Sequence, residues 1–119
     1  MNAKTASRSP VAADISILNV ARAFSEAVRA QFGDLVAEVT LFGSAARGDA
    51  QPDSDADVLV LVRRLTYSLW AKIVGLASDV SAEHGVYVSA TVMSLTRWNQ
   101  HRRADTLLYR NISSQGVRL

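Results

Sequence analysis

Apolar side chains recur every three or four residues along two long segments of the chain, 14–32 and 66–84. This spacing gathers them on one face of a helix, so both segments are predicted to be amphipathic helices. Asp14 can cap the first turn of the first helix. Gly33 and Gly85 follow the two periodic segments, and glycine commonly ends a helix. The pattern therefore predicts two helices with defined ends.

Three other segments carry the pattern of β-strands. Residues 35–42 and 58–62 are rich in leucine and β-branched residues, and the unbroken run at 58–62 is expected for a central strand that is covered on both faces. Residues 86–92 alternate between small apolar side chains on one face and polar ones on the other. The polar face of this third strand carries Tyr87, Ser89 and Thr91.

Together these elements predict an α/β fold with a small mixed β-sheet flanked by helices. A short helix is expected after the first strand, and a last helix that carries Trp98 can be capped by Ser94 or Thr96. The expected order is helix, strand, short helix, strand, helix, strand, helix. Because the helix at 66–84 is long enough for a crossover, the second and third strands are predicted to be parallel. Residues 107–109 precede a predicted polar tail.

The length and composition fit one compact domain. A chain of 119 residues can form one core but not two, so residues 14–119 are predicted to be a single domain. Residues 1–13 are small and polar around Pro10, which predicts a flexible N-terminal arm. A hydrophobic share of 49% and a charged share of 20% exclude a disordered or fibrous protein. Since no stretch approaches the ~20 apolar residues of a membrane span, a cytoplasmic location is expected.

Charge and cysteine content limit the ligands and the metal sites that the chain can have. The formal net charge of +2 is too small to argue for nucleic acid, although 63–64 and 102–103 are pairs of arginines. A nucleic-acid-binding module is thus the least supported class. The chain has no cysteine, which excludes disulfides and thiolate chemistry. Any metal ion must therefore be held by oxygen or imidazole ligands.

The first candidate site residues follow the first predicted strand. Gly43 allows the backbone to approach a phosphate closely, and Ser44 adds a hydroxyl donor. Arg47 lies three residues further on, on the same helical face as Ser44. A helix that begins here presents free N–H groups and its positive end to an anion. The segment predicts a phosphate site, although for the Gly43–Ser44 pair taken alone a strand-to-helix turn with a glycine and a capping serine is the favoured explanation.

Two carboxylates open the second predicted strand. Asp55 and Asp57 are two residues apart, so on a strand both leave the same face, about 6.6 Å apart along the chain. Two carboxylates this close repel each other, and a shared Mg²⁺ ion relieves that repulsion. Burying an unpaired carboxylate is costly, so Asp57 in an apolar run favours a functional role. Asp53 and Ser54 fit a solvated turn after Pro52, and Ser54 is also a candidate nucleotide contact.

The pair Gly43–Ser44, ten intervening residues, and then Asp55-x-Asp57 resemble the signature of the DNA polymerase β-like nucleotidyltransferase superfamily. The short chain resembles the minimal nucleotidyltransferase branch, and a weaker similarity covers 88–98 and 109–117. The resemblance implies a polymerase β-like fold, with Gly43 and Ser44 at the nucleotide triphosphate. It also implies that Asp55 and Asp57 are catalytic and ligate Mg²⁺.

The activity that the resemblance implies is Mg²⁺-dependent transfer of a nucleoside monophosphate, AMP from ATP, to an acceptor. A chain this short has little left to build an acceptor pocket, so a protein partner or a homo-oligomer is expected. The family resemblance points to a HEPN-type toxin as the partner. The chain would then be the antitoxin of a HEPN/MNT toxin–antitoxin pair.

One departure from the family pattern concerns a third carboxylate. Active members commonly supply it from the next strand, where this chain offers the polar face with Ser89. The nearest acids, Asp79 and Glu83, fall in the preceding predicted helix. The alternative interpretation is therefore a catalytically impaired nucleotide-binding or protein-interaction subunit.

Four other residues are assigned structural roles. His84 suits a helix end, where a cation meets the negative helix terminus, and His101 is expected at the surface. Trp70 and Trp98 stand at helical spacing with other apolar residues, which predicts core packing or a partner interface. None of the four is predicted to belong to the site.

Overall fold

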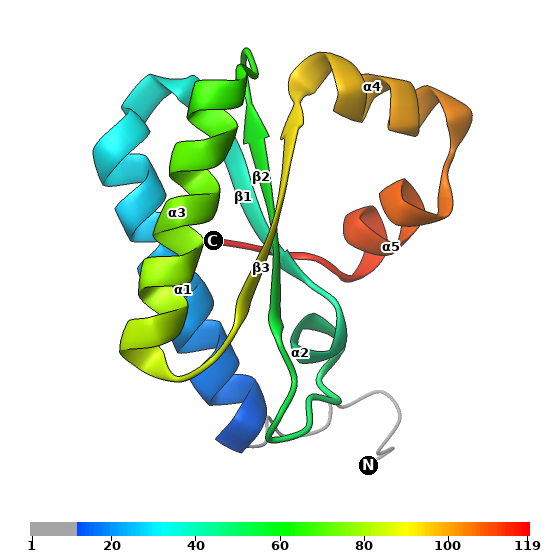
Figure 1. Ribbon diagram of the computed structural model, residues 1–119. Coiled ribbons are helices and arrows are strands. Elements are labelled where there is room, and N and C mark those ends of the chain that lie inside the picture. Colours follow the sequence, from blue (N-terminus) through cyan, green and yellow to red (C-terminus); the bar gives the residue numbers. More distant parts are fainter. Residues whose placement is uncertain (1–11) are drawn as a thin grey trace.

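The computed structural model describes residues 12–119 and has the predicted α/β architecture (Figure 1). Of the predicted N-terminal arm, residues 1–11 lie outside the described residues, and the last two positions already belong to the first helix. The elements in chain order are α1 (Ala12–Phe32), the 3₁₀ helix η1 (Gly33–Leu35), β1 (Val36–Phe42), α2 (Ser44–Arg47), β2 (Ala56–Val62), α3 (Tyr67–His84), β3 (Val88–Ser94), α4 (Leu95–Ala104), α5 (Leu107–Gln115) and β4 (Val117–Arg118).

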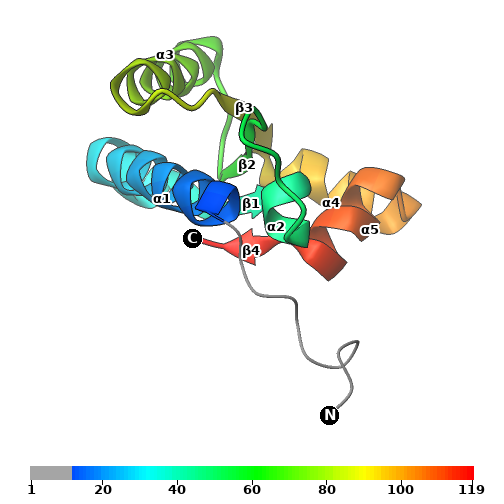
Figure 2. The ribbon, with the colours of Figure 1, turned by 90° about the horizontal axis from the view of Figure 1, so that it is seen from below.

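The strands form one mixed sheet in the order β3-β2-β1-β4. The predicted parallel pairing of the second and third strands is confirmed, because β2 and β3 pair in parallel from Ala56↔Val88 to Val62↔Ser94. β1 pairs with β2 and with β4 in antiparallel fashion. Helices α1 and α3 cover one face of the sheet, and α4 and α5 lie on the opposite side (Figures 1 and 2). The fold is therefore a small mixed sheet flanked by helices, as predicted.

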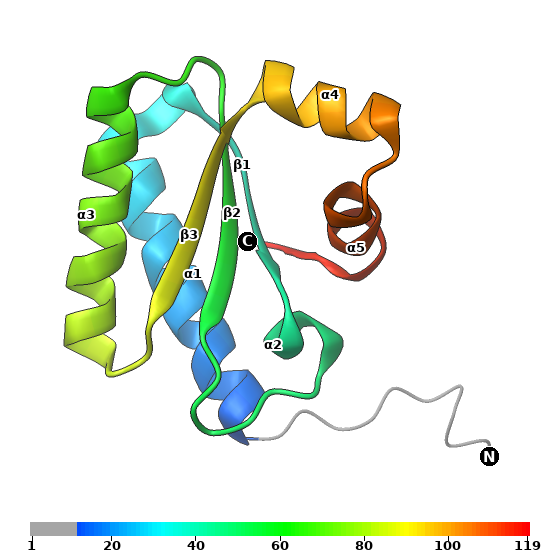
Figure 3. The same cartoon turned by 45° about the vertical axis from the view of Figure 1, so that its right-hand side comes forward.

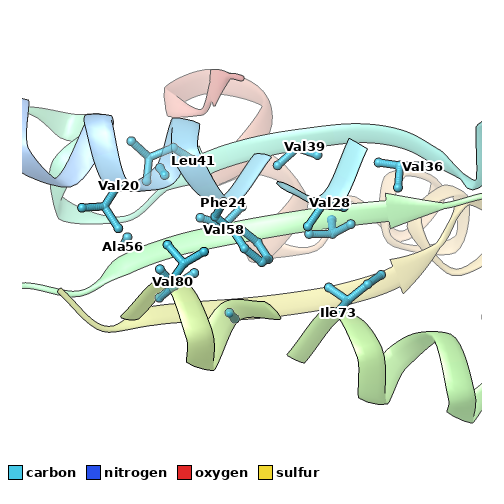
Figure 4. Packing of buried hydrophobic residues seen from close by; sticks show 14 of the residues in the cluster. Val20, Phe24, Val28, Val36, Val39, Leu41, Ala56, Val58, Ile73 and Val80 are labelled. Atoms are coloured by element: carbon cyan, nitrogen blue, oxygen red, sulfur yellow. The ribbon is translucent and has the colours of Figure 1, made fainter. Parts of the chain in front are cut away.

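The larger part of the core lies between the sheet and the pair α1 and α3. Phe24 of α1, Ile73 of α3 and Val58 of β2 are fully buried there (Figure 4). On the opposite face, Leu59 and Leu61 of β2 pack in a second cluster beneath α4 and α5. Side chains alternate between the faces of a strand, so the continuous apolar run in β2 is explained by burial on both sides.

Capping residues fix the helix ends near the predicted positions. The Thr66 hydroxyl accepts a hydrogen bond from Leu69 N at 3.1 Å at the start of α3. Gly85 ends α3 in the left-handed conformation, with φ 70°. Ser94, and not Thr96, caps α4, because its hydroxyl accepts from Arg97 N at 3.1 Å. These side chains satisfy backbone groups that a helix end leaves unpaired.

The C-terminal segment differs from the predicted polar tail, because it contains α5 and the short strand β4. The Thr106 hydroxyl accepts from Tyr109 N and caps α5, and Ile112 is buried. β4 extends the sheet by pairing Thr40↔Arg118 on its neighbour β1. α5 is amphipathic, with Leu108 and Ile112 four residues apart on the face toward the sheet, but nine residues are short for a helical period to be recognised. β4 has only two residues and forms by pairing with β1.

The four residues assigned structural roles have mixed outcomes. His84 lies in the last turn of α3, as predicted, and Trp98 packs against the second core cluster. Trp70 is 41% exposed and stacks on Tyr67, so core packing is wrong for this residue. His101 is partly exposed, and its Nδ1 lies 2.9 Å from the Thr106 hydroxyl. Within residues 12–119, no helix combines the length and apolarity that crossing a membrane requires.

Candidate active site

Gly43 lies between β1 and α2, and Asp57 is the second residue of β2. Figure 3 shows α2 beside the lower end of the sheet. Phe42, the last residue of β1, pairs with Asp57 of β2. Gly43 follows with φ 80° and ψ −156°, a conformation almost restricted to glycine. A Cβ atom at Gly43 would overlap Asp57 Oδ2 and lie 3.1 Å from Asp57 Cγ. The carboxylate therefore lies directly against a backbone that tolerates no side chain.

Helix α2 is a single turn that begins beside this carboxylate. Gly43 is its N-cap, Ser44 its first residue and Arg47 its last. Gly48 ends the turn in the left-handed conformation, and Arg47 Nε lies 3.6 Å from Asp49 Oδ2 in an exposed ion pair. The predicted short helix is confirmed, and Ser44 and Arg47 lie on the single turn that follows Gly43, the residue that contacts Asp57.

Asp57 carries the electrostatic strain of the site. Burial raises the pKa of its carboxyl above the ordinary value, and repulsion by the nearby Asp55 raises it further. The Arg47 guanidinium acts in the opposite direction and lowers this pKa. Asp55 is exposed and lies just before β2, so the two aspartates do not both sit on the strand as predicted. A partly buried carboxylate with a second one nearby attracts a cation.

The loop from Gly48 to Asp55 is held by two side chains. Ala50 N donates a hydrogen bond at 2.9 Å to Oδ1 of Asp14, which is only 6% exposed in α1. The Ser54 hydroxyl accepts from Gln51 N at 2.9 Å, so this side chain shapes the turn. The predicted nucleotide contact of Ser54 stays a prediction.

Sequence reasoning treated Asp14 only as a helix cap and missed its contact with the loop. A signal was present, because Asp14 stands three residues before Ile17 on the apolar face of α1. A carboxylate on a buried face needs a polar partner, and here the partner is the loop that leads to the two aspartates.

On the neighbouring strand β3, Ser89 is the register partner of Asp57. The position beside the partly buried Asp57 carboxylate is therefore occupied by a hydroxyl. Thr91 pairs with Leu59, further along the sheet, and Tyr87 precedes β3 with 61% of its surface exposed. Within the part of the chain that the structure describes, no group of three or more His, Cys, Asp and Glu residues is arranged to hold a metal ion.

The model of the nucleotidyltransferase domain family matches residues 21–112, which contain β1, α2, β2 and β3. The chain belongs to this family. The predicted family and enzyme class are thereby confirmed, and the chain is a nucleotidyltransferase.

Two relatives resemble this nucleotidyltransferase over most of its length. A protein of Methanocaldococcus jannaschii named "Putative protein adenylyltransferase" is 32% identical over 83 residues, which make up 69% of this chain and 84% of the relative. A solved structure described as a "putative minimal nucleotidyltransferase" is 28% identical, with a TM-score of 0.53, and the match covers 86% of this chain and 95% of that one.

More distant structures share the nucleotidyltransferase fold. A toxin–antitoxin complex with AMP-PNP matches with 21% identity and a TM-score of 0.54, over 81% of this chain and 69% of that one. A complex of tri-AMPylated Shewanella oneidensis HEPN toxin with MNT antitoxin matches with 18% identity and a TM-score of 0.51, over 86% and 70%. At these identities the likeness shows the fold alone.

Proposed function

We propose that this nucleotidyltransferase transfers AMP from ATP to a side chain of a partner protein, with Mg²⁺ held by Asp55 and Asp57. The observation that carries this proposal is the Asp57 carboxylate, which lies against the Gly43 backbone with its pKa raised by burial and by Asp55. A strained carboxylate of this kind is a common feature of a functional site. A divalent cation relieves the strain that burial and repulsion create.

The donor set suits Mg²⁺. This ion prefers oxygen ligands and is usually held by one or two carboxylates together with substrate phosphates. Asp55 and Asp57 supply two carboxylates, and the triphosphate of ATP supplies the remaining charged oxygens. The bound ion would neutralise negative charge at the phosphorus that is transferred.

The remaining site residues would bind the triphosphate. The glycine at position 43 leaves room for a phosphate beside the backbone, and the Ser44 hydroxyl can donate to it. The Arg47 guanidinium is a planar, permanently charged donor that suits phosphate oxygens. Ser54 would contribute from the loop. In-line transfer depends mainly on such positioning, so the chain needs no nucleophile of its own.

A partner protein is proposed as the acceptor. The named relative is called a protein adenylyltransferase, and one structural neighbour comes from a complex that contains an AMPylated HEPN toxin. These names support a HEPN-type toxin as the acceptor and an antitoxin role for this chain. ATP as donor and a toxin as acceptor both fit a cytoplasmic reaction.

Label transfer tests the proposal. The protein is incubated with its co-purifying partner, α-labelled ATP and Mg²⁺, beside the variants Asp55→Asn and Asp57→Asn. We expect each variant to lose at least about 100-fold in transfer rate, since a metal carboxylate is removed. Asp53→Asn is the matched control, because Asp53 is exposed in the same loop and should retain full activity. Equal transfer by Asp57→Asn and Asp53→Asn would rule the proposal out.

A second candidate function is a catalytically impaired nucleotide-binding or protein-interaction subunit. Ser89 favours it, because a hydroxyl beside Asp57 cannot act as a base toward the acceptor at neutral pH. We predict that Ser89→Asp increases label transfer by about 100-fold, the usual contribution of a positioned base. Ser89→Asn controls for size without charge. Transfer by Ser89→Asp alone would establish the impaired function for the natural chain, whereas an unchanged rate would show that the site needs no third carboxylate.

A further inference from the structure

A cleft of about 280 Å³ lies between the edge of the sheet and the two C-terminal helices, apart from the two aspartates. Figure 2 labels the four elements that form it, β1, β4, α4 and α5. Its lining combines charged, hydroxyl and aromatic side chains: Glu38, Thr40, Trp98, Arg102, Tyr109, Ile112, Ser113, Gly116 and Arg118.

The floor of the cleft belongs to the same face of the sheet as Asp57. Phe42 is the antiparallel partner of Asp57, so their side chains leave the sheet on one side. Thr40 and Glu38 follow at alternate positions of β1, and Thr40 lies about 7 Å along the strand from Phe42. The cleft and the aspartates are thus two parts of one sheet face.

The Glu38 carboxylate is a hydrogen-bond acceptor on the floor of the cleft. The Thr40 hydroxyl donates to Glu38 Oε2 at 2.9 Å, and Arg118 Nη2 lies 3.5 Å from Glu38 Oε1. These two contacts hold the carboxylate in place without using all of its lone pairs. Around it, Arg102, Tyr109 and Ser113 make no side-chain hydrogen bond or ion pair within residues 12–119. The cleft therefore offers one held acceptor and several available donors.

The wall of the cleft is aromatic. The rings of Trp98 and Tyr109 lie 5.3 Å apart and are tilted by 53°. Trp98 also packs against the buried cluster that contains Leu59 and Leu61, so its ring is held by the core. Flat ligands such as nucleobases stack on rings presented in this way.

We propose that this cleft binds the nucleoside part of the nucleotide, with adenine against Trp98 and Tyr109 and its 6-amino group donating to Glu38. The assignment rests on the proposed function, which brings the triphosphate to Gly43 and Ser44. A volume near the lower end of small-ligand pockets, about 300–1,000 Å³, suits a base with its ribose better than a peptide or a polynucleotide. Thr40 and Ser44 are four residues apart, at most roughly 13 Å for an extended chain, and the ribose and triphosphate would bridge this interval.

Tryptophan fluorescence tests the assignment directly. The chain has two tryptophans, and Trp70→Phe leaves Trp98 as the reporter. In this background, adenosine is expected to quench the emission saturably, whereas inorganic tripolyphosphate leaves it unchanged. Inosine is the same size but presents a carbonyl oxygen to the Glu38 carboxylate, so it should bind at least about tenfold more weakly.

Variants locate the effect in the cleft. Glu38→Gln should remove the preference for adenosine over inosine, and Glu83→Gln, an exposed acid on α3, should retain it. Arg102→Ala should weaken adenosine about fivefold, and since Arg102 is exposed this variant should fold as the parent does. Absence of adenosine quenching, or a preference over inosine that survives Glu38→Gln in a folded variant, would overturn the assignment while label transfer continued. Adenosine binding without any label transfer would overturn only the proposed function.

Discussion

The Asp57 carboxylate combines three influences that act in different directions. Burial and the Asp55 carboxylate raise its pKa, and Arg47 lowers it. The carboxylate lies directly against the Gly43 backbone, where even a methyl group would overlap it. Such an arrangement costs stability in the absence of a cation and is typical of a site selected for function.

Gly43→Ala should reduce label transfer by more than the backbone strain of an alanine at positive φ accounts for. The new methyl group would displace the Asp57 carboxylate, and a shift of about 1 Å can reduce a rate about 100-fold. Gly85→Ala is the control, because Gly85 also has positive φ but a Cβ there would meet nothing within 4 Å. Both variants should lose about 1 kcal/mol or more of stability, measured by denaturant unfolding. Label transfer should fall only in Gly43→Ala, and an equal fall in both variants would contradict the account.

Asp57→Asn should stabilise the metal-free protein at neutral pH. The folded-state pKa of Asp57 lies above its ordinary value of 3.8, so the native state favours the protonated form. The stability of the natural protein relative to the variant therefore falls as pH rises from about 3.8 through the folded-state pKa. Because solvent screens a partly exposed carboxylate, the gain should not exceed about 1 kcal/mol.

Thermal unfolding as a function of pH measures this effect. The Tm difference between Asp57→Asn and the natural protein should be positive at pH 7 and should vanish below pH 3.8, where both side chains are neutral. Added Mg²⁺ should raise the Tm of the natural protein and leave that of the variant unchanged. A variant that is less stable at pH 7 without metal would contradict the assigned strain.

At the scale of elements, helix α5 decides whether the second face of the sheet is closed. Ile112 is 4% exposed and packs with Leu59 and Leu61, whereas Leu107 of the same helix is 67% exposed. Ile112→Ala should therefore cost about 2–4 kcal/mol of unfolding free energy, and Leu107→Ala less than about 0.5 kcal/mol. Urea unfolding of the two variants measures the difference. Equal costs would mean that α5 does not pack on the sheet.

The elements that sequence reasoning predicted are those with a strong local pattern. The helical period of α1 and α3 and the apolar run of β2 were sufficient to predict their type and the parallel pairing of β2 with β3. α5 was missed although Leu108 and Ile112 stand four residues apart on one face, because nine residues are short for a helical period to be recognised. β4 was missed because it exists only by pairing with the distant strand β1. Local patterns carry little information about such contacts.

The candidate site was likewise predicted only where its residues lie close together in the sequence. Gly43, Ser44 and the two aspartates fall within fifteen consecutive residues, so their motif could be read directly from the chain. The contact of Asp14 with Ala50 joins residues 36 positions apart and was not predicted. The cleft was missed as well, because it forms only when the C-terminal helices return to β1.

At the scale of the whole molecule, one face of the sheet forms most of the core and the other carries the candidate site. The face under α1 and α3 holds most of the buried apolar residues and provides a rigid support. The other face carries Asp57 at the N-terminal end of β2 and the cleft near β4. Sites built on such a supported sheet hold their geometry better than sites on loops alone.

The central claim is that this fold uses Asp57 to transfer AMP to a protein. The most direct measurement is the intact mass of the co-purifying partner after incubation with ATP and Mg²⁺. The account predicts that the partner gains whole adenylate increments with the natural chain and with Asp53→Asn, and none with Asp57→Asn. A partner whose mass stays unchanged with the natural chain, or increases equally with Asp57→Asn, would contradict it.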